Sequence, residues 1–197
     1  MNKDKNFYTI NRIAALSDGI FAIAMTILVL NISIPDKETV NQIGLFNALL
    51  NQGVEFYTFL LSFVLLGIFW GIQHKQMNII QKTDSTFIWL NILLLMCICL
   101  IPFSASLESE FSSNPVSAIF FNTNMLIVGL FFMINLLYAT NNHKLIPEDY
   151  SKESIIKGKK NTLIFIGVSI IALILGMFSP EYSGIAYVLI PVLKAFT

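Results

Sequence analysis

Apolar residues dominate the chain in long stretches, and short polar segments separate these stretches. A helix that crosses a bilayer needs about 20 predominantly apolar residues, and six stretches reach or approach that length. We therefore predict six transmembrane helices, at residues 13–34, 54–73, 86–107, 116–139, 162–178 and 183–196. The last of them is shorter than the others and contains Pro191.

The composition supports this interpretation of the pattern. Hydrophobic residues make up 55% of the 197 residues, and charged residues only 12%. Soluble domains carry about 25% charged residues, so this chain has too few to cover a water-facing surface. We predict an all-α integral membrane protein in which residues 1–197 form a single domain.

The first apolar stretch follows basic residues, as the core of a signal peptide would. It also contains Asp18 near its start, is as long as a full membrane span, and lacks a small-x-small cleavage site at its end. We therefore expect it to be retained as a transmembrane helix.

The basic residues predict the orientation. All of the 12 Lys and Arg residues except Lys37 lie in the N-terminal segment, the second and fourth connections, or the C-terminal segment. Because such residues stay on the cytoplasmic side, both termini should be cytoplasmic in a multi-pass protein of the plasma membrane. The lysine cluster of residues 141–161 enforces this orientation, and it should also attract anionic lipids.

Several classes of function lack their sequence signatures. The chain has no Gly-x-Ser-x-Gly, no His-Glu-x-x-His and no pair of intramembrane aspartates, so we predict no enzyme. The formal net charge is zero and the lysines form no stripe with aromatic residues, which argues against nucleic acid as a partner. Cys97 and Cys99 are expected to be free thiols, and we predict neither a cofactor nor a resident metal ion.

Polar residues inside a membrane span are costly, so those of the first predicted helix are the leading functional candidates. At about 100° per residue, one narrow face of that helix carries five residues: Gly19, Ile23, Thr26, Ile27 and Leu30. Asp18 points to the opposite side. In the simplest interpretation the apolar stripe meets lipid or another helix, while Asp18 meets a buried partner.

The same helix resembles the signature of the transmembrane protein 175 family, the endosomal and lysosomal potassium channels and their bacterial relatives. The matching residues are Arg12, Leu16-Ser17-Asp18, Gly19, Ala22-Ile23-Ala24, Thr26 and Leu28 to Leu30, with Leu16 in place of the family's Phe. Trp70 and His74 in the second span are also similar, as is Asn91 followed by a Leu-rich run into Pro102. The resemblance covers the first half of the chain.

The resemblance implies a homotetramer of six-helix subunits in which the first helix of each subunit lines a central pore. It implies a leak-like channel that is permeable to potassium and other monovalent cations and has no carbonyl-loop filter. Ile23, Ile27 and Leu30 would form the hydrophobic constriction, with Thr26 and Gly19 lining the pore beside them. The expected partners are these cations, the lipid bilayer and other copies of the chain.

The remaining motif residues are expected to form a polar lock that supports the pore helix. We hypothesise that Asp18 and Ser17 bond to groups of the second and third helices, with three named candidates: Trp70, His74 and Asn91. Arg12 would neutralise Asp18. His74 can also be interpreted as a solvated histidine at the membrane interface.

Other functions stay open. A proton-permeable channel of the same family is one. A small secondary transporter is another, and it would need broken helices with a polar site at mid-membrane. Asn135 is the best candidate for such a site, although a helix–helix hydrogen bond is the better explanation of it. A purely structural or assembly role is also compatible with the sequence.

Overall fold

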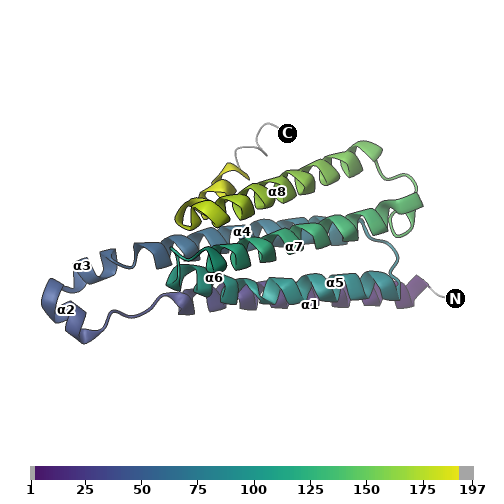
Figure 1. Ribbon diagram of the computed structural model, residues 1–197. Helices are drawn as coiled ribbons and strands as arrows, with labels where there is room; N and C mark the ends of the chain where they lie inside the picture. The colour runs from purple at the N-terminus through teal and green to yellow at the C-terminus, as the bar shows by residue number, and fades with distance from the viewer. Residues whose placement is uncertain (1–2, 191–197) are drawn as a thin grey trace.

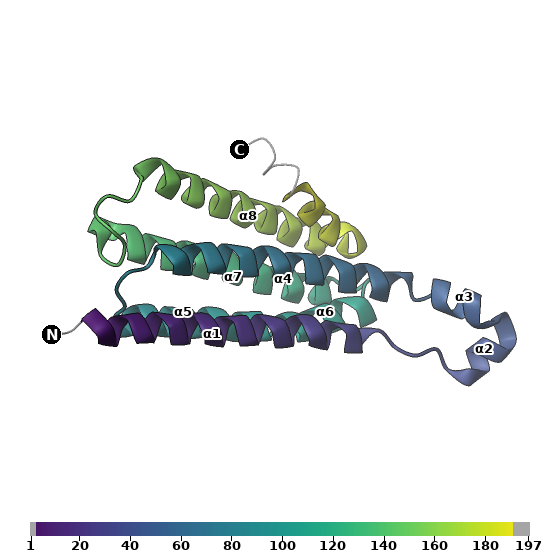
Figure 2. The same cartoon turned by 180° about the vertical axis from the view of Figure 1, so that it is seen from behind.

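The computed structural model describes residues 3–190, and helices form nearly all of that range (Figure 1). The α-helices are α1 (Lys3–Ile27), α2 (Lys37–Ile43), α3 (Leu45–Leu50), α4 (Gly53–Ile79), α5 (Ser85–Cys99), α6 (Ile101–Glu110), α7 (Pro115–Thr140) and α8 (Lys152–Phe178). Three short 3-10 helices accompany them: η1 (Leu28–Asn31), η2 (Asn141–His143) and η3 (Pro180–Val188). The long helices lie side by side as a bundle, and α2 with α3 forms an arm at one end (Figures 1 and 2).

Five stretches within the described residues are long and apolar enough to cross a membrane. They are Ile10–Asn31, Gly53–Ile79, Ser85–Glu110, Pro115–His143 and Lys152–Phe178. The sixth stretch, predicted at 183–196, begins inside the 3-10 helix η3, and its last six residues lie outside the described range. The sixth transmembrane helix therefore stays a prediction.

Local sequence explains where the helices begin and break. Asp84 caps α5 by accepting a hydrogen bond from the Phe87 N–H, and Ser151 caps α8. The third predicted span divides into α5 and α6 near Leu100, because Pro102 has no N–H to continue the helix. Helix α8 begins at Lys152, ten residues before the predicted span, since lysines extend a helix without entering the apolar layer.

The centre of the bundle is an aromatic core. The ring of Phe69 on α4 lies 5.7 Å from that of Phe132 on α7 and 4.9 Å from that of Phe165 on α8. Gly129 lets α7 and α8 approach closely here, since a Cβ at that position would lie 2.8 Å from the Phe165 ring. The helices of the first half of the chain are thereby packed against those of the second.

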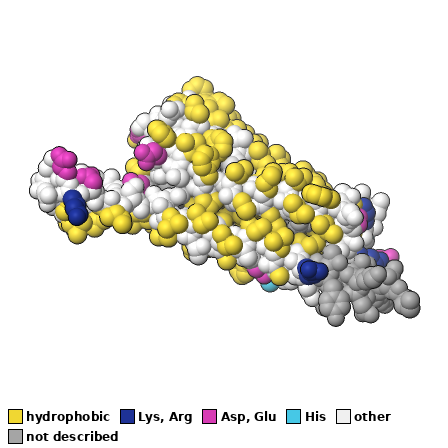
Figure 3. Space-filling view, turned by 90° about the horizontal axis from the view of Figure 1, so that it is seen from below, with side chains coloured by type: hydrophobic (Ala, Val, Ile, Leu, Met, Phe, Trp, Pro, Cys, Tyr) yellow, Lys and Arg dark blue, Asp and Glu magenta, His cyan; other side chains and the backbone are white. Residues whose placement is uncertain are grey.

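The start of α1 and the α4–α5 and α7–α8 connections lie at one end of the bundle, and the α2–α3 arm lies at the other (Figure 1). We call the first of these the basic end, defined by Arg12, Lys75, Lys82, Lys144 and Lys157. On the face shown in Figure 3, hydrophobic side chains cover most of the length between the ends, and charged groups are few. The positive-inside pattern predicts that the basic end is cytoplasmic.

A polar clamp closes the basic end, formed by Asp84, Tyr138 and Lys144. Lys144 lies 3.1 Å from Asp84, and the Tyr138 hydroxyl donates to the Asp84 carboxylate over 2.6 Å. The Lys144 ammonium also donates to the Tyr138 hydroxyl. The Gln81 N–H donates to the Leu145 carbonyl over 2.8 Å, which binds the α4–α5 connection to the α7–α8 connection.

Candidate functional site

Helix α1, together with η1 that continues it to Asn31, has one packed face and one open face. Residues spaced three or four apart turn inward against α4 and α5, as expected for a helix at a bundle surface: Ile13, Ser17, Phe21, Ala24 and Leu28. On the other side Ile23, Ile27 and Leu30 expose 59%, 41% and 77% of their surface. The stripe that the sequence predicts on one face is therefore uncovered in the single chain.

The other two residues of the stripe are open as well. Thr26 is exposed, and its hydroxyl donates to the Ile23 carbonyl over 2.9 Å. This bond uses the proton and leaves the oxygen lone pairs on the open side. At Gly19 a Cβ would meet no atom within 4 Å. Arg12 is exposed and falls within about 20° of the angular position of Ile23, so it extends the same face toward the basic end.

Asp18 lies at the edge between the two faces of α1, and its partner is Trp70 on α4. The indole N–H of Trp70 donates to the Asp18 carboxylate over 2.9 Å. The Trp70 and His74 rings lie one helical turn apart, with centroids 5.7 Å apart and planes 31° apart. His74 itself is exposed. The structure thus places Asp18, Trp70 and His74 together along one edge of α1 and α4.

Ser17 and Asn91 belong to a separate network in the core. The side-chain amide of Gln73 donates to the Ser17 hydroxyl over 3.3 Å and to the Asn91 Oδ1 atom over 3.0 Å. The Asn91 amide in turn donates to Asn135 over 3.1 Å. All four side chains are buried, and they join α1, α4, α5 and α7.

The residues expected to form one polar lock therefore separate into two groups. Adjacent residues of a helix point about 100° apart, so Ser17 turns into the core while Asp18 turns toward α4. Arg12 does not pair with Asp18, and the ion pair that the described residues do form is the one between Lys144 and Asp84. Sequence reasoning missed Gln73, although an amide within an apolar span was an available signal.

Asn135 makes a helix–helix hydrogen bond, in which its side-chain oxygen accepts from the Asn91 amide. It also donates to the Phe131 carbonyl of its own helix over 2.9 Å. Cys97 is buried, Cys99 is exposed, and both are free thiols. Within the described residues, no group of three or more His, Cys, Asp or Glu side chains is placed to hold a metal ion.

Comparisons with known proteins find relatives that match most of the chain. Residues 12–102 match the family model described as endosomal/lysosomal potassium channel TMEM175. A potassium channel of Chamaesiphon minutus is 30% identical over 182 residues, which cover 90% of each chain. An endosomal/lysosomal proton channel TMEM175 of Danio rerio is 24% identical over 193 residues, which cover 92% of this chain and 35% of the relative.

A solved structure shows the same fold. The crystal structure of a lysosomal potassium-selective channel TMEM175 homologue from Chamaesiphon minutus superposes with a TM-score of 0.84. The superposition covers 96% of this chain and 98% of that chain at 27% sequence identity. The resemblance found in the motifs of the first half therefore extends to the whole helical bundle.

Proposed function

Because the chain belongs to the TMEM175 family of potassium channels, we propose that it is a leak-like, potassium-permeable cation channel whose pore is lined by α1. The observation that carries this proposal is the open stripe of α1. Ile23, Ile27 and Leu30 stay exposed although the other face of the same helix is closely packed. Four copies of the chain around one axis would bring these stripes together as a pore.

Rings of aliphatic side chains would act on an ion differently from a filter of carbonyl groups. They offer no ligands, so a narrow ring expels water and raises a barrier, whereas a wider one passes a partly hydrated cation. Selectivity for potassium over sodium should then be modest. Thr26 is the one side chain of the stripe that carries an oxygen, and we assign it the role of sharpening selectivity.

The Gln73 network and the Trp70–Asp18 bond would hold α1 in the orientation about its own axis that this pore needs. The Gln73 network fixes the packed face, and the Trp70–Asp18 bond fixes the edge. Hydrogen bonds between membrane helices contribute about 0.6 kcal/mol on average. Several such bonds acting on one helix are needed to keep Ile23 aimed at the pore axis.

A proton-permeable channel is the second candidate, favoured by vertebrate relatives that are named proton channels. Between Gly19 and Leu30 the stripe carries no titratable group, so protons would have to move along water. A transporter receives less support, since α1, α4, α7 and α8 run without a break along most of the bundle. We place the protein in the plasma membrane with both termini in the cytoplasm.

Purified protein in liposomes tests the proposal. We expect Ile23→Asn to raise potassium flux or lower the K⁺/Na⁺ ratio, because an amide removes the dewetting barrier. Ile171→Asn on α8 is the matched control, since Ile171 is 55% exposed and lies on another helix. The proposal is wrong if the two variants conduct alike, or if cross-linking places the α1 stripes of different subunits apart.

A further inference from the structure

A cavity of ≈ 400 Å³ lies at the basic end between α4, α7 and α8. Its walls are aliphatic, with Ile72 and Ile79 from α4, Leu136 from α7 and Ile155 from α8. Gly71 contributes no side chain, and a Cβ there would meet nothing within 4 Å. The channel function proposed above does not use this space, which lies away from the open face of α1.

The cavity also has a basic, polar rim. Lys75 of α4 and Lys157 of α8 line it from opposite sides, and both are exposed. None of the described residues that line the cavity is acidic. The ion pair of the basic end joins Lys144 to Asp84, and among the residues whose side chains are described Lys75 and Lys157 have no carboxylate partner. The rim is therefore suited to an anion.

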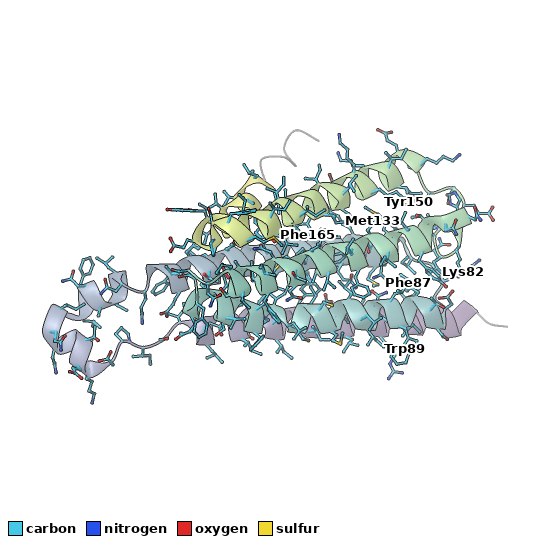
Figure 4. All side chains as sticks on the ribbon, viewed as in Figure 1. Lys82, Phe87, Trp89, Met133, Tyr150 and Phe165 are labelled. Atoms are coloured by element: carbon cyan, nitrogen blue, oxygen red, sulfur yellow. The ribbon has the colours of Figure 1, made fainter. Side chains whose placement is uncertain are left out.

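Hydrogen-bonding groups lie beside the two lysines. Tyr150 and Ser154 line the cavity where the chain enters α8, so the partial positive charge of that helix end adds to the lysine charges. Tyr150 is drawn at this end, between α7 and α8 (Figure 4). The Asn161 Oδ1 atom is buried without a hydrogen-bond partner. Such an acceptor needs a donor, and a bound hydroxyl group would supply one.

A basic rim above aliphatic walls matches the two ends of a phospholipid. A free phosphate would use the lysines but leave the apolar walls exposed to water, whereas an acyl chain covers them. The leaflet expected at the basic end is the cytoplasmic one, which is rich in anionic lipids. Phosphatidic acid offers the anion alone, and phosphatidylglycerol adds headgroup hydroxyls that can donate to Asn161.

We propose that this cavity is a binding site for an anionic phospholipid with a hydroxyl-bearing headgroup, of the phosphatidylglycerol class. Its phosphate binds between Lys75 and Lys157, a headgroup hydroxyl donates to Asn161, and one acyl chain lies along Ile68 and Ile72. The bound lipid joins α4 to α8 at the level where the α7–α8 connection leaves the bundle.

Native mass spectrometry of the full-length protein titrated with dioleoyl phosphatidylglycerol tests the site. We expect Lys75→Gln/Lys157→Gln to weaken binding about tenfold or more, because each lysine near an anionic headgroup contributes substantially. The control variant Lys152→Gln/Lys160→Gln also removes two positive charges, but from positions on α8 that do not line the cavity. It should leave binding unchanged. Equal loss in both double variants would show diffuse electrostatic attraction and would overturn the proposal.

Three further arms identify the occupant. Gly71→Leu should fill the cavity and abolish lipid retention without unfolding, since the space there is open. Asn161→Leu should remove the preference for phosphatidylglycerol over phosphatidic acid, and inorganic phosphate should not displace the lipid. If Gly71→Leu instead changes the oligomer mass and no lipid is retained by wild type, another subunit covers the cavity and the proposal fails. These experiments measure lipid binding, so they test the lipid site independently of whether the protein conducts ions.

Discussion

The indole N–H of Trp70 donates to the Asp18 carboxylate across 2.9 Å, and this bond joins α4 to the edge of α1. Asp18 lies between Ser17, which is buried in the core, and Gly19, which begins the open stripe. A bond at this position resists rotation of α1 in either direction. In the proposed channel, this bond would fix which residues of α1 face outward.

Trp70→Phe should remove the hydrogen bond to Asp18 while keeping an aromatic ring at this position. We expect a lower melting temperature of the assembled protein and altered potassium flux, because the Asp18 carboxylate loses a donor worth roughly 1 kcal/mol at an exposed position. Trp89→Phe is the control, since Trp89 is an exposed tryptophan on α5. Thermal unfolding and liposome flux measure both effects. Identical behaviour of the two variants would remove the bond from the mechanism.

Gln73→Leu should destabilise the bundle more strongly. The change leaves the Asn91 Oδ1 atom without its donor and removes the donor that reaches Ser17, with an expected cost of about 1–3 kcal/mol. Thr140→Val is the matched control, because Thr140 is also buried and its hydroxyl donates to the Leu136 carbonyl of its own helix. Denaturant titration in detergent compares the two. An equal loss of stability would show that Gln73 contributes by burial rather than by linking helices.

The membrane helices and the open stripe were predictable because both depend on local periodicity. The apolar composition of residues 13–34 predicts a membrane span. The rotation of about 100° per residue around the helix axis then places Ile23 and Leu30 on the same face. The family resemblance is likewise confirmed. Trp70 was among the candidate partners named for Asp18, but the core network could not be predicted, because Gln73 and Asn135 reach Asn91 only through the packing of three helices.

The sequence also predicted the ends of the helices only in part. Hydropathy marks the apolar layer, but α8 continues ten residues beyond it into the lysine-rich segment. The break between α5 and α6 required the geometry of Pro102 rather than its apolar character. The cavity at the basic end depends on how α4, α7 and α8 diverge, and no local pattern of Gly71 or Lys157 specifies that.

Thr26→Ala should lower the K⁺/Na⁺ permeability ratio. The exposed hydroxyl is the one oxygen on the stripe between Gly19 and Leu30, and a pore of aliphatic rings has no other side-chain ligand there. Thr26→Ser keeps the hydroxyl and should keep the ratio. Reversal potentials in bi-ionic solutions measure it. If the K⁺/Na⁺ permeability ratio is unchanged in Thr26→Ala, the hydroxyl does not contribute, and the selectivity comes from the width of the pore alone.

The clamp at the basic end should make stability depend on pH in a defined direction. Burial raises the pKa of Asp84, but hydrogen bonds from Tyr138, the Phe87 N–H and Lys144 outweigh it and hold that pKa below 3.8. The hydrogen bond to Tyr138 and the nearby Asp84 carboxylate raise the pKa of Lys144 above 10.5. A carboxylate with a lowered pKa stabilises the fold above its unfolded value and loses that effect as the pH falls through its folded value. A lysine with a raised pKa stabilises below its unfolded value and loses the effect as the pH rises through its folded value.

The clamp should therefore keep its full contribution between about pH 5 and pH 9. Asp84→Asn should lower the melting temperature throughout that window, and the difference from wild type should shrink below pH 3.8 as Asp84 itself becomes protonated. Asp149→Asn removes a carboxylate from the same end of the bundle without touching the clamp, so it serves as the control. Because both partners are partly exposed, the effect should also weaken in high salt. A difference that stays constant from pH 7 to pH 3 would show that the neutral hydrogen bonds of Asp84, rather than its charge, hold the two connections together.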